Sequence, residues 1–297
     1  MFAPYKNKVE IVYGDITDKK WIKTICSGTS IAVHLAAVIP PLADKIPELA
    51  YRVNTLGTRL LVKGLERYSP DSFLLYSSSI SVYGDRLNAP FIKVGDPVHT
   101  SDGDKYAKTK VDAESLIKKS RINWCILRLT AIMGKHKMSK LMFHMPLETS
   151  LELSTPKDTA RAFVNAIEKK DLLSGKTYNL GGGEKMRINY KELLSRSFKI
   201  YGLGKLNFSA NTFALRNFHC GYYMDGDELE KILHFRKDTV ESYFEGLSGS
   251  VPPFKKFITK IFRTWIKYVL IRKSEPLRAI LTNNTAQIHR FFGNIKN

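Results

Sequence analysis

Short apolar runs alternate with segments of helical periodicity through the first half of this 297-residue chain. Four runs rich in β-branched and other apolar residues occupy positions 9–13, 31–35, 73–76 and 124–129. We interpret them as strands, because such runs with little polar alternation are typical of strands buried on both faces. Apolar residues recur at helical spacing over 50–68 and 106–119. Strands that alternate with helices in this way predict an α/β fold with a parallel sheet.

The pattern changes after Gly134, where a Met-rich, irregular stretch begins. Beyond it the periodicity predicts helices at 158–169, 188–200 and 227–233, a strand at 176–180, and an aromatic, loop-like stretch at 202–224. Ser248-Gly249-Ser250 and two prolines then predict a linker before the last segment of the chain.

Basic residues are concentrated near the C-terminus. The formal net charge is +19, and residues 251–297 hold ten Lys and Arg against one acid, Glu275. Apolar residues recur there at helical spacing, with lysines between them: Phe254, Phe257, Ile258, Ile261, Phe262, Trp265, Ile266, Val269 and Leu270. An amphipathic helix of this composition suits an anionic membrane surface. The alternative is a helix packed on the core with solvated lysines.

Cysteine usage and hydropathy exclude several classes of protein. Cys26, Cys125 and Cys220 are widely spaced, so the sequence predicts neither a disulfide framework nor a metal site. Residues 1–8 lack the apolar stretch of a signal peptide, and no segment has the roughly 18 apolar residues that span a membrane. We therefore expect a cytoplasmic protein, peripheral at the inner membrane face if its tail binds there.

Tyr106 and Lys110 form a candidate catalytic pair. A spacing of four places them on one face of the predicted helix, one turn apart. A phenol normally has a pKa of about 10, and a neighbouring ammonium group lowers this pKa, which suits proton transfer at a hydroxyl group. A second Tyr-x-x-x-Lys at 201–205 is incidental, so the spacing alone is weak evidence.

Hydroxyl side chains follow the predicted strand at 73–76. Ser77, Ser78 and Ser79 come directly after it, and Ser81 is close behind. Ligands of open α/β sheets bind beyond the carboxyl ends of the strands. A serine there can hydrogen-bond a substrate hydroxyl while a tyrosine transfers its proton; the alternative is a serine-rich turn.

Several short motifs follow one another in a fixed order. They read GDITD at 14–18, HLAA at 34–37, NTLGT at 54–58, SSSISVYG at 77–84, YAKTK at 106–110, LRL at 127–129, DTA at 158–160 and YNLGG at 178–182. In this order they resemble the extended short-chain dehydrogenases/reductases, the NAD-dependent epimerase/dehydratase family, over roughly residues 8 to 247.

The resemblance implies roles for single residues. Tyr106 would be the acid/base, Lys110 would bind the nicotinamide ribose and lower the pKa of the tyrosine, and Ser79 would orient the substrate. Ser81 and Tyr83 would also bind substrate. The cofactor, NAD or NADP, would contact Asp15, Ile16, Leu35, Ala36, Ala37, Tyr106, Lys110, Leu129 and Thr130. Asn54 is expected to be a structural cap.

The resemblance also implies a domain organisation. Residues 1–135 would form a Rossmann-like dinucleotide-binding domain, with 158–180 packed on it. Residues 136–250 would form mainly a small C-terminal substrate lobe, and 251–297 the basic amphipathic helical tail.

One departure from the family lies at the N-terminus. The family begins with a strand, a glycine-rich turn and a helix that bind the pyrophosphate, and no such turn precedes Gly14 here. We therefore expect an N-terminally incomplete sheet with unpaired strand edges. A misassigned start or a fragment, a second polypeptide that supplies the unit, and an inactive relative each account for this; the intact Ser79, Tyr106 and Lys110 favour the first.

These expectations lead to an NAD(P)-dependent oxidoreductase or epimerase acting on a secondary alcohol, with a nucleoside-diphosphate sugar as the favoured substrate. A sterol-type alcohol dehydrogenase, or a non-catalytic family member bound to a membrane through 254–273, is the alternative. Nucleic acid is disfavoured because no recognised module accompanies the charge, and a homodimer is compatible with the sequence. Ile80 and Ser81 follow Ser79 where a dehydratase usually has acidic residues, which argues against dehydration.

Overall fold

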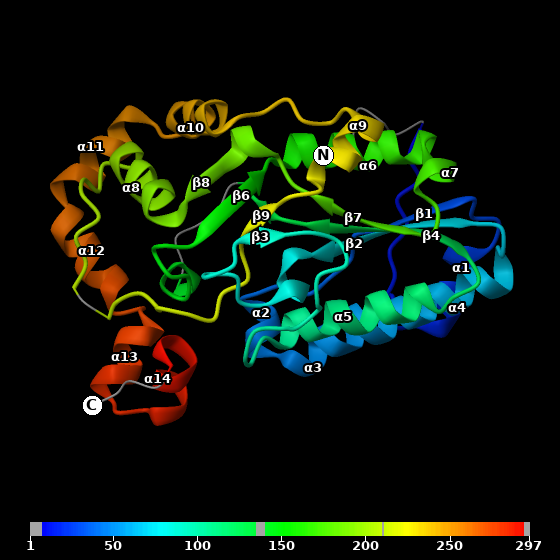
Figure 1. Ribbon diagram of the computed structural model, residues 1–297, viewed down its shortest axis with the longest axis horizontal. Helices are drawn as coiled ribbons and strands as arrows, with labels where there is room; N and C mark the ends of the chain where they lie inside the picture. The colour runs from blue at the N-terminus through cyan, green and yellow to red at the C-terminus, as the bar shows by residue number, and fades with distance from the viewer. Residues whose placement is uncertain (1–7, 135–139, 210, 294–297) are drawn as a thin grey trace.

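A parallel sheet lies at the centre of the computed structural model, which describes residues 8–134, 140–209 and 211–293 (Figure 1). Its strand order is β1-β2-β4-β7, and every neighbouring pair is parallel. The strands are β1 (Ile31–His34), β2 (Phe73–Ser79), β4 (Asn123–Leu129) and β7 (Lys176–Leu180). The predicted α/β fold is therefore confirmed, and β2 extends three residues further than predicted, through the serines.

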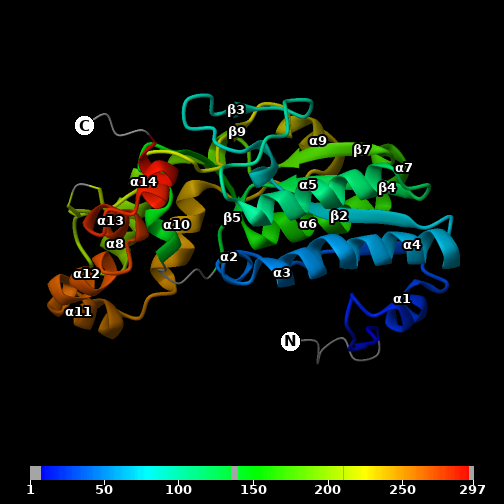
Figure 2. The same cartoon turned by 90° about the horizontal axis from the view of Figure 1, so that it is seen from below.

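Helices cover both faces of this sheet (Figures 1 and 2). One face carries α1 (Lys19–Cys26), α2 (Leu42–Lys45), α3 (Pro47–Ala50), the π-helical η2 (Tyr51–Gly57), α4 (Thr58–Tyr68) and α5 (Lys105–Lys118). The other face carries α6 (Pro156–Glu168), α7 (Lys170–Leu173) and α9 (Gly226–Leu233). Thr155 caps α6, since its side chain accepts a hydrogen bond from the backbone N–H of Asp158.

Alternating side chains of β2 divide the core into two layers. Phe73 and Leu75 pack toward α6 and α9, whereas Leu74 and Tyr76 pack toward α4 and α5. Successive side chains of a strand point to opposite faces, so a run that is apolar throughout buries both faces. Cys125, on β4, is fully buried in the first of these layers.

A second lobe packs beside the sheet. It contains β5 (Ala131–Ile132), β6 (Ser150–Ser154), β8 (Arg187–Asn189), α8 (Tyr190–Ile200) and α10 (Val240–Gly249), with the short helices η4 (Lys140–Phe143) and η5 (Glu184–Met186). Its core is aromatic and includes the buried Phe143, Phe198, Phe213 and Phe244. A small parallel pair, β3 (Phe91–Ile92) with β9 (Tyr222–Tyr223), lies between this lobe and the 3-10 helix η3 (Ile80–Tyr83) that follows β2.

The C-terminal segment forms four helices: α11 (Pro253–Ile261), α12 (Arg263–Ile271), α13 (Glu275–Leu281) and α14 (Thr285–Phe292). The last two pack as a pair on the second lobe, where the backbone N–H of Leu215 donates to the carbonyl of Phe291 at 2.8 Å. Ser274 anchors the start of α13, because its hydroxyl donates to the carbonyl of Thr212 at 2.6 Å. No helix in the described ranges is long and apolar enough to cross a membrane.

Four sequence predictions of local structure are wrong. Residues 9–13 are exposed and form no strand, since no described strand pairs with them and an isolated strand gains no ladder. The predicted linker at 248–250 is mostly the end of α10, which continues to Gly249. The helix predicted from residue 188 begins at Tyr190, after the strand β8. The strand β6 lies partly in the stretch interpreted as irregular, and its partners are distant in sequence.

Candidate active site

Ser79 and Tyr106 meet at the carboxyl end of β2. Ser79 is the last residue of β2, opposite Leu129 of β4, and its hydroxyl accepts a hydrogen bond from the N–H of Ser81 at 3.1 Å. Tyr106 stands in the first turn of α5, whose N-terminus Asp104 caps. The side chain of Ser79 lies close enough to that of Tyr106 to lower its pKa. The structure therefore brings together the two hydroxyls that the sequence selects for substrate orientation and proton transfer.

Lys110 lies one turn further along α5 and is almost fully buried. Its Nζ donates to the carbonyl oxygen of Ser77 at 2.7 Å and lies 4.9 Å from the ring centre of Tyr76. The same Nζ is 5.9 Å from the ring centre of Tyr106. The ammonium group thus lies between two tyrosine rings and is held by a strand carbonyl.

Burial controls the protonation of this pair. It raises the pKa of Tyr106 to about 12, although the neighbouring side chain of Ser79 lowers it. It also lowers the pKa of Lys110 to about 8, against the opposing attraction of Glu114. The ammonium group of Lys110 is directed at the Ser77 carbonyl, and its lowering of the tyrosine pKa stays a prediction.

A buried ion pair between Glu114 and Arg128 lies behind Tyr106 and Lys110. Arg128 donates to Glu114 through Nε at 2.9 Å and through Nη2 at 2.7 Å, and both side chains are buried. Ser78 donates to the same carboxylate at 2.6 Å. Arg128 Nη1 also donates to the hydroxyl of Tyr83 at 2.7 Å, which in turn donates to Asn179 Oδ1 at 2.8 Å. This network fixes β2, β4, β7 and α5 relative to one another.

Sequence reasoning assigned no role to Glu114 or Arg128. Burial raises the pKa of Glu114, but the hydrogen bonds and charge of Arg128 outweigh it and leave this pKa below its ordinary value. The chain does contain a sign of the pair: Arg128 interrupts an apolar strand, and Glu114 follows Lys110 by one helical turn. A charge inside a buried strand requires a partner, because an unpaired buried charge is costly.

The predicted adenine contacts lie at an exposed turn near the N-terminus. Asp15 is exposed, and its Oδ1 accepts hydrogen bonds from the backbone N–H and the hydroxyl of Thr17, both at 2.8 Å. A Cβ added to Gly14 would lie 2.1 Å from the Trp21 ring, so only glycine lets this indole lie on the turn. Ile16 packs into the core against Gly57. The adenine contacts stay predictions.

The remaining predicted cofactor residues follow β1 and β4. Leu35 and Ala36 are exposed and Ala37 is half-buried, directly after β1. Leu129 is half-buried, whereas Thr130 is buried and its hydroxyl donates to the carbonyl of Glu152. These residues lie at the carboxyl ends of the two strands that flank β2. Asn54 fills the structural role expected of it.

Asn54 joins the segment after β1 to α5. Its Oδ1 accepts from the N–H of Val38 at 2.7 Å, and its Nδ2 donates to the carbonyl of Val38 and to Thr109 Oγ1.

Of the predicted substrate residues, Tyr83 borders a polar cavity. Tyr83 is buried and engaged with Arg128 and Asn179, and Ser81 is buried with a hydroxyl that has no partner among the described residues. A cavity of about 360 Å³ opens beside Tyr83 and is lined by Asp85, Arg86, His99, Ser101, Arg216 and Asn217 among others.

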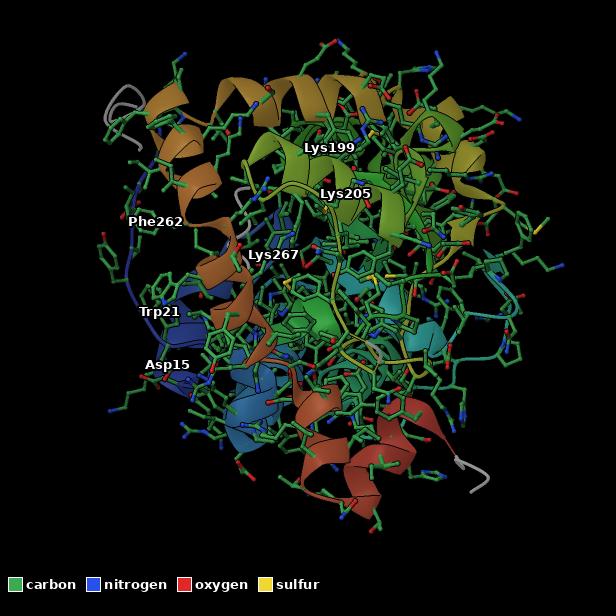
Figure 3. All side chains as sticks on the ribbon, turned by 90° about the vertical axis from the view of Figure 1, so that its left-hand side faces the viewer. Asp15, Trp21, Lys199, Lys205, Phe262 and Lys267 are labelled. Atoms are coloured by element: carbon green, nitrogen blue, oxygen red, sulfur yellow. The ribbon has the colours of Figure 1, made fainter. Side chains whose placement is uncertain are left out.

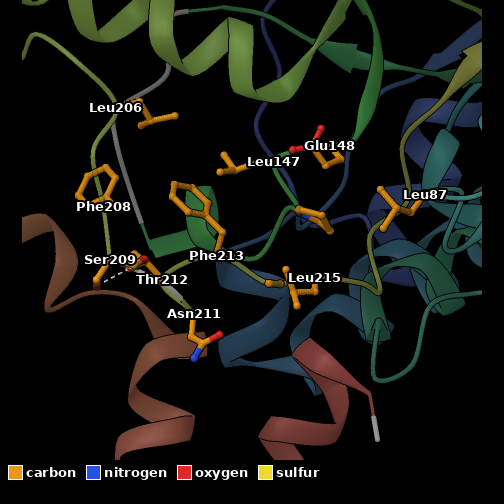
Figure 4. Close-up of a pocket in the computed structure, with 12 residues that line it drawn as sticks. Leu87, Leu147, Glu148, Leu206, Phe208, Ser209, Asn211, Thr212, Phe213 and Leu215 are labelled. Carbon is orange, nitrogen blue, oxygen red and sulfur yellow. Dashed lines mark hydrogen bonds between the residues drawn. The ribbon is translucent and has the colours of Figure 1, made fainter. Parts of the chain in front are cut away.

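A separate cavity lies in the second lobe (Figure 4). It measures about 330 Å³ and is lined by Leu147, Phe208 and Phe213 among others. As with the polar cavity beside Tyr83, neither Ser79 nor Tyr106 lines it.

Known proteins share these features. Residues 3–149 match the model of the 3-beta hydroxysteroid dehydrogenase/isomerase family. The chain folds like dTDP-glucose 4,6-dehydratase from Streptomyces venezuelae, solved with NAD bound, with a TM-score of 0.65, 19% identity, and 89% and 84% of the two chains covered. A short-chain dehydrogenase/reductase superfamily protein from Agrobacterium tumefaciens, solved with NAD, gives a TM-score of 0.63 at 16% identity over 88% and 90%. These matches support an extended short-chain dehydrogenase/reductase.

Curated proteins match a smaller part of this chain than the solved structures do. D-erythronate dehydrogenase from Haemophilus influenzae is 26% identical over 60% of this chain. Mouse 3 beta-hydroxysteroid dehydrogenase type 7 is 24% identical over 47% of it. The chain spans less than two-thirds of either relative, 62% of the first and 41% of the second.

The family implies a dinucleotide cofactor. The described residues supply hydrogen-bond donors for one end of it only. Ser79, Tyr106 and Lys110 supply hydroxyl and ammonium groups at the carboxyl end of β2, where a nicotinamide ribose would lie. For the pyrophosphate, the described residues contain no glycine-rich turn between a strand and a helix, and no described strand pairs with the outer edge of β1. The residues therefore fit the nicotinamide end of the group.

Proposed function

We propose that this chain carries the acid–base half of an NAD(P)-dependent oxidoreductase or epimerase that acts on a secondary alcohol. The observation that supports it best is the proximity of Ser79 and Tyr106 at the carboxyl end of β2, with Lys110 one turn behind. Ligands of parallel sheets bind at this end of the strands.

Each residue of the candidate site has its own role in this proposal. Lys110 and Tyr106 would hold the ribose of a bound nicotinamide, which would supply the hydride chemistry. Ser79 orients the hydroxyl or carbonyl of the substrate. Tyr106, a phenol at neutral pH because burial raises its pKa to about 12, donates its proton to a carbonyl oxygen in the reducing direction. In the oxidising direction it must first lose that proton, so we expect the oxidation rate to rise with pH.

A nucleoside-diphosphate sugar is the substrate that the polar cavity supports. Arg86 and Arg216 line it, Arg86 with Asp96 at 3.4 Å and Arg216 with Asp102 at 3.6 Å. Guanidinium groups bind phosphate oxygens through paired hydrogen bonds. The match to the hydroxysteroid dehydrogenase family favours a sterol-type alcohol as the second candidate.

Binding and turnover test the proposal. Calorimetric titration of the full chain with NAD and NADP should give saturable binding, and turnover should be measured with nucleoside-diphosphate hexoses and a 3β-hydroxysteroid. We expect Tyr106→Phe to lower turnover by at least about 100-fold, the size of a general acid–base contribution, and to leave the fold intact. No cofactor binding by the folded chain, or full activity of Tyr106→Phe, would contradict the proposal.

Arg86→Gln separates the two substrate classes. We expect it to raise the KM for a nucleoside-diphosphate sugar at least tenfold and to leave the KM for a steroid unchanged, since only the sugar nucleotide carries phosphates. The reverse result would assign the sterol-type alcohol.

An anionic membrane surface, bound through residues 254–273, is the second partner that we propose. The helices in this range, α11 and α12, contain none of the candidate catalytic residues Ser79, Tyr106 and Lys110. A homodimer stays a prediction.

A further inference from the structure

Exposed apolar side chains cover one side of α11 and α12. Seven large residues, spaced by one, three or four positions, form the α11–α12 face: Phe254, Phe257, Ile258, Ile261, Phe262, Trp265 and Tyr268. Phe254 is 75% exposed and Trp265 is 65% exposed. Aromatic side chains are rarely left this exposed in such numbers unless they bind a partner.

The other side of the two helices is attached to the second lobe. Leu270 is buried and Ile266 is partly buried against the aromatic core of that lobe. α11 has no buried residue and rests on the turn after α8, where a Cβ added to Gly202 would lie 2.6 Å from the carbonyl oxygen of Lys256. The core of the second lobe therefore buries part of α12, whereas no described residue covers the α11–α12 face.

Positive charge surrounds this face without internal compensation. No acidic residue occurs between Val251 and Ser274, while seven basic residues do: Lys255, Lys256, Lys260, Arg263, Lys267, Arg272 and Lys273. None of the seven forms a salt bridge with any residue that the structure describes. Lys199 and Lys205 lie on the same side of the molecule as Phe262 and Lys267 (Figure 3) and are also exposed.

One contact orients this charge. Lys267 Nζ donates to the carbonyl of Lys205 and to Asn207 Oδ1, both at 2.5 Å, and so ties α12 to the loop after α8. Such a surface complements a partner that is negatively charged and has an apolar layer beneath its charge.

We propose that the α11–α12 face binds the surface of a membrane that contains acidic lipids. The aromatic side chains would lie at the level of the headgroups, and the lysines, whose long stems extend past apolar surface, would reach the lipid phosphates and carboxylates. Two helices of nine residues each lie in the plane of such a surface rather than across it. The inference goes beyond the proposed oxidoreductase activity, because it involves neither the catalytic groups nor the cofactor.

Vesicle flotation tests this proposal with the full-length chain. We expect binding to vesicles of phosphatidylcholine with phosphatidylserine, much weaker binding to phosphatidylcholine alone, and loss of binding as salt is raised. Lys255→Gln/Lys256→Gln/Lys260→Gln should weaken binding to the acidic vesicles on the order of 100-fold, since each basic residue near the surface contributes about a fivefold factor.

The matched control removes the same charge elsewhere. Lys19, Lys20 and Lys23 are exposed on α1. Replacing these three with Gln should leave flotation within about threefold of the unmodified chain, because α1 lies outside the α11–α12 face. Equal losses for the two triple variants would show that net charge alone drives binding and would overturn the proposal.

The apolar part of the face needs its own variant. Phe254→Ser/Phe257→Ser should lower binding at least tenfold, whereas Val164→Ser/Leu172→Ser, at two exposed positions outside the face, should not change it. Trp265 emission should shift to shorter wavelength with acidic vesicles, and Trp265→Phe identifies this residue as its source. Failure of the unmodified chain to float with acidic vesicles would overturn the proposal, and cofactor binding in the same preparation would show that the proposed activity is unaffected.

Discussion

The interior of the sheet and the surface of α11 show opposite departures from the usual distribution of polarity. Behind Tyr106, the side chains of Glu114 and Arg128 are only 4% and 3% exposed although both are charged. On α11, Phe254 is 75% exposed although it is apolar. Both arrangements cost free energy relative to the reverse placement.

The two regions differ in where this cost is offset. Hydrogen bonds from Arg128, Ser78 and Lys118 satisfy the buried carboxylate of Glu114 within the chain. No described residue covers Phe254 or Phe257. The interior network therefore supports folding, whereas the exposed face gains free energy only with a partner. Substitutions in the two regions should accordingly change different measurements.

The largest effect on stability is expected from Arg128→Leu. This change leaves the Glu114 carboxylate buried without its bidentate partner, so we expect the free energy of unfolding to fall by about 3–5 kcal/mol. Urea unfolding followed by circular dichroism measures it. The double variant Glu114→Leu/Arg128→Leu removes both charges and should be less destabilised than the single one. A double variant that loses the sum of both single effects would contradict the pairing.

A pH-dependent effect of intermediate size is expected from His34. Burial lowers its pKa to about 3, and the charge of Lys110 adds to this, while Nε2 lies 2.8 Å from Thr58 Oγ1. The unfolded chain binds a proton near the ordinary pKa of 6.5, so it binds more protons than the folded chain between about pH 6.5 and 3. Stability should therefore fall as pH drops through this range, by up to about 1.4 kcal/mol per pH unit.

The variant His34→Gln tests the origin of that slope. It removes the titrating group and should flatten the fall in stability between pH 6.5 and 5, measured by thermal unfolding. His289→Gln, at an exposed position on α14, is the control and should keep the slope of the unmodified chain. An unchanged slope in His34→Gln would assign the acid sensitivity to other groups.

The sequence predicted the sheet well because its strands are buried on both faces. The runs at 31–35, 73–76 and 124–129 contain little besides apolar residues, and α5 carries a clear cap at Asp104. Residues 9–13 have the same composition but form no strand, since a strand depends on a neighbour that local pattern does not reveal. The strand β6 was missed for the same reason: its partners β5 and β8 lie on either side of it in sequence, tens of residues apart.

The candidate site was predicted in part. Ser79 and Tyr106 meet because ordered motifs give the position of a strand end and a helix start. The direction of the Lys110 side chain did not follow from its spacing, since a flexible lysine takes the nearest acceptor, here the Ser77 carbonyl. The outward side of α12 was likewise undetermined, because the predicted stripe included both the exposed Trp265 and the buried Leu270. Which part of an apolar stripe is buried depends on tertiary packing.

The smallest expected change in stability gives the sharpest test of the contrast between the buried interior and the α11–α12 face. Phe257→Ala, on the α11–α12 face, should change the free energy of unfolding by less than about 0.5 kcal/mol, as is usual for exposed positions. Phe244→Ala, in the second-lobe core and 4% exposed, should cost about 3–5 kcal/mol. Urea unfolding without lipid measures both. A large loss for Phe257→Ala would mean that α11 packs on the protein in solution, and the face would then not be free for a membrane. A negligible loss, together with weakened flotation, would show that this phenylalanine acts only between molecules.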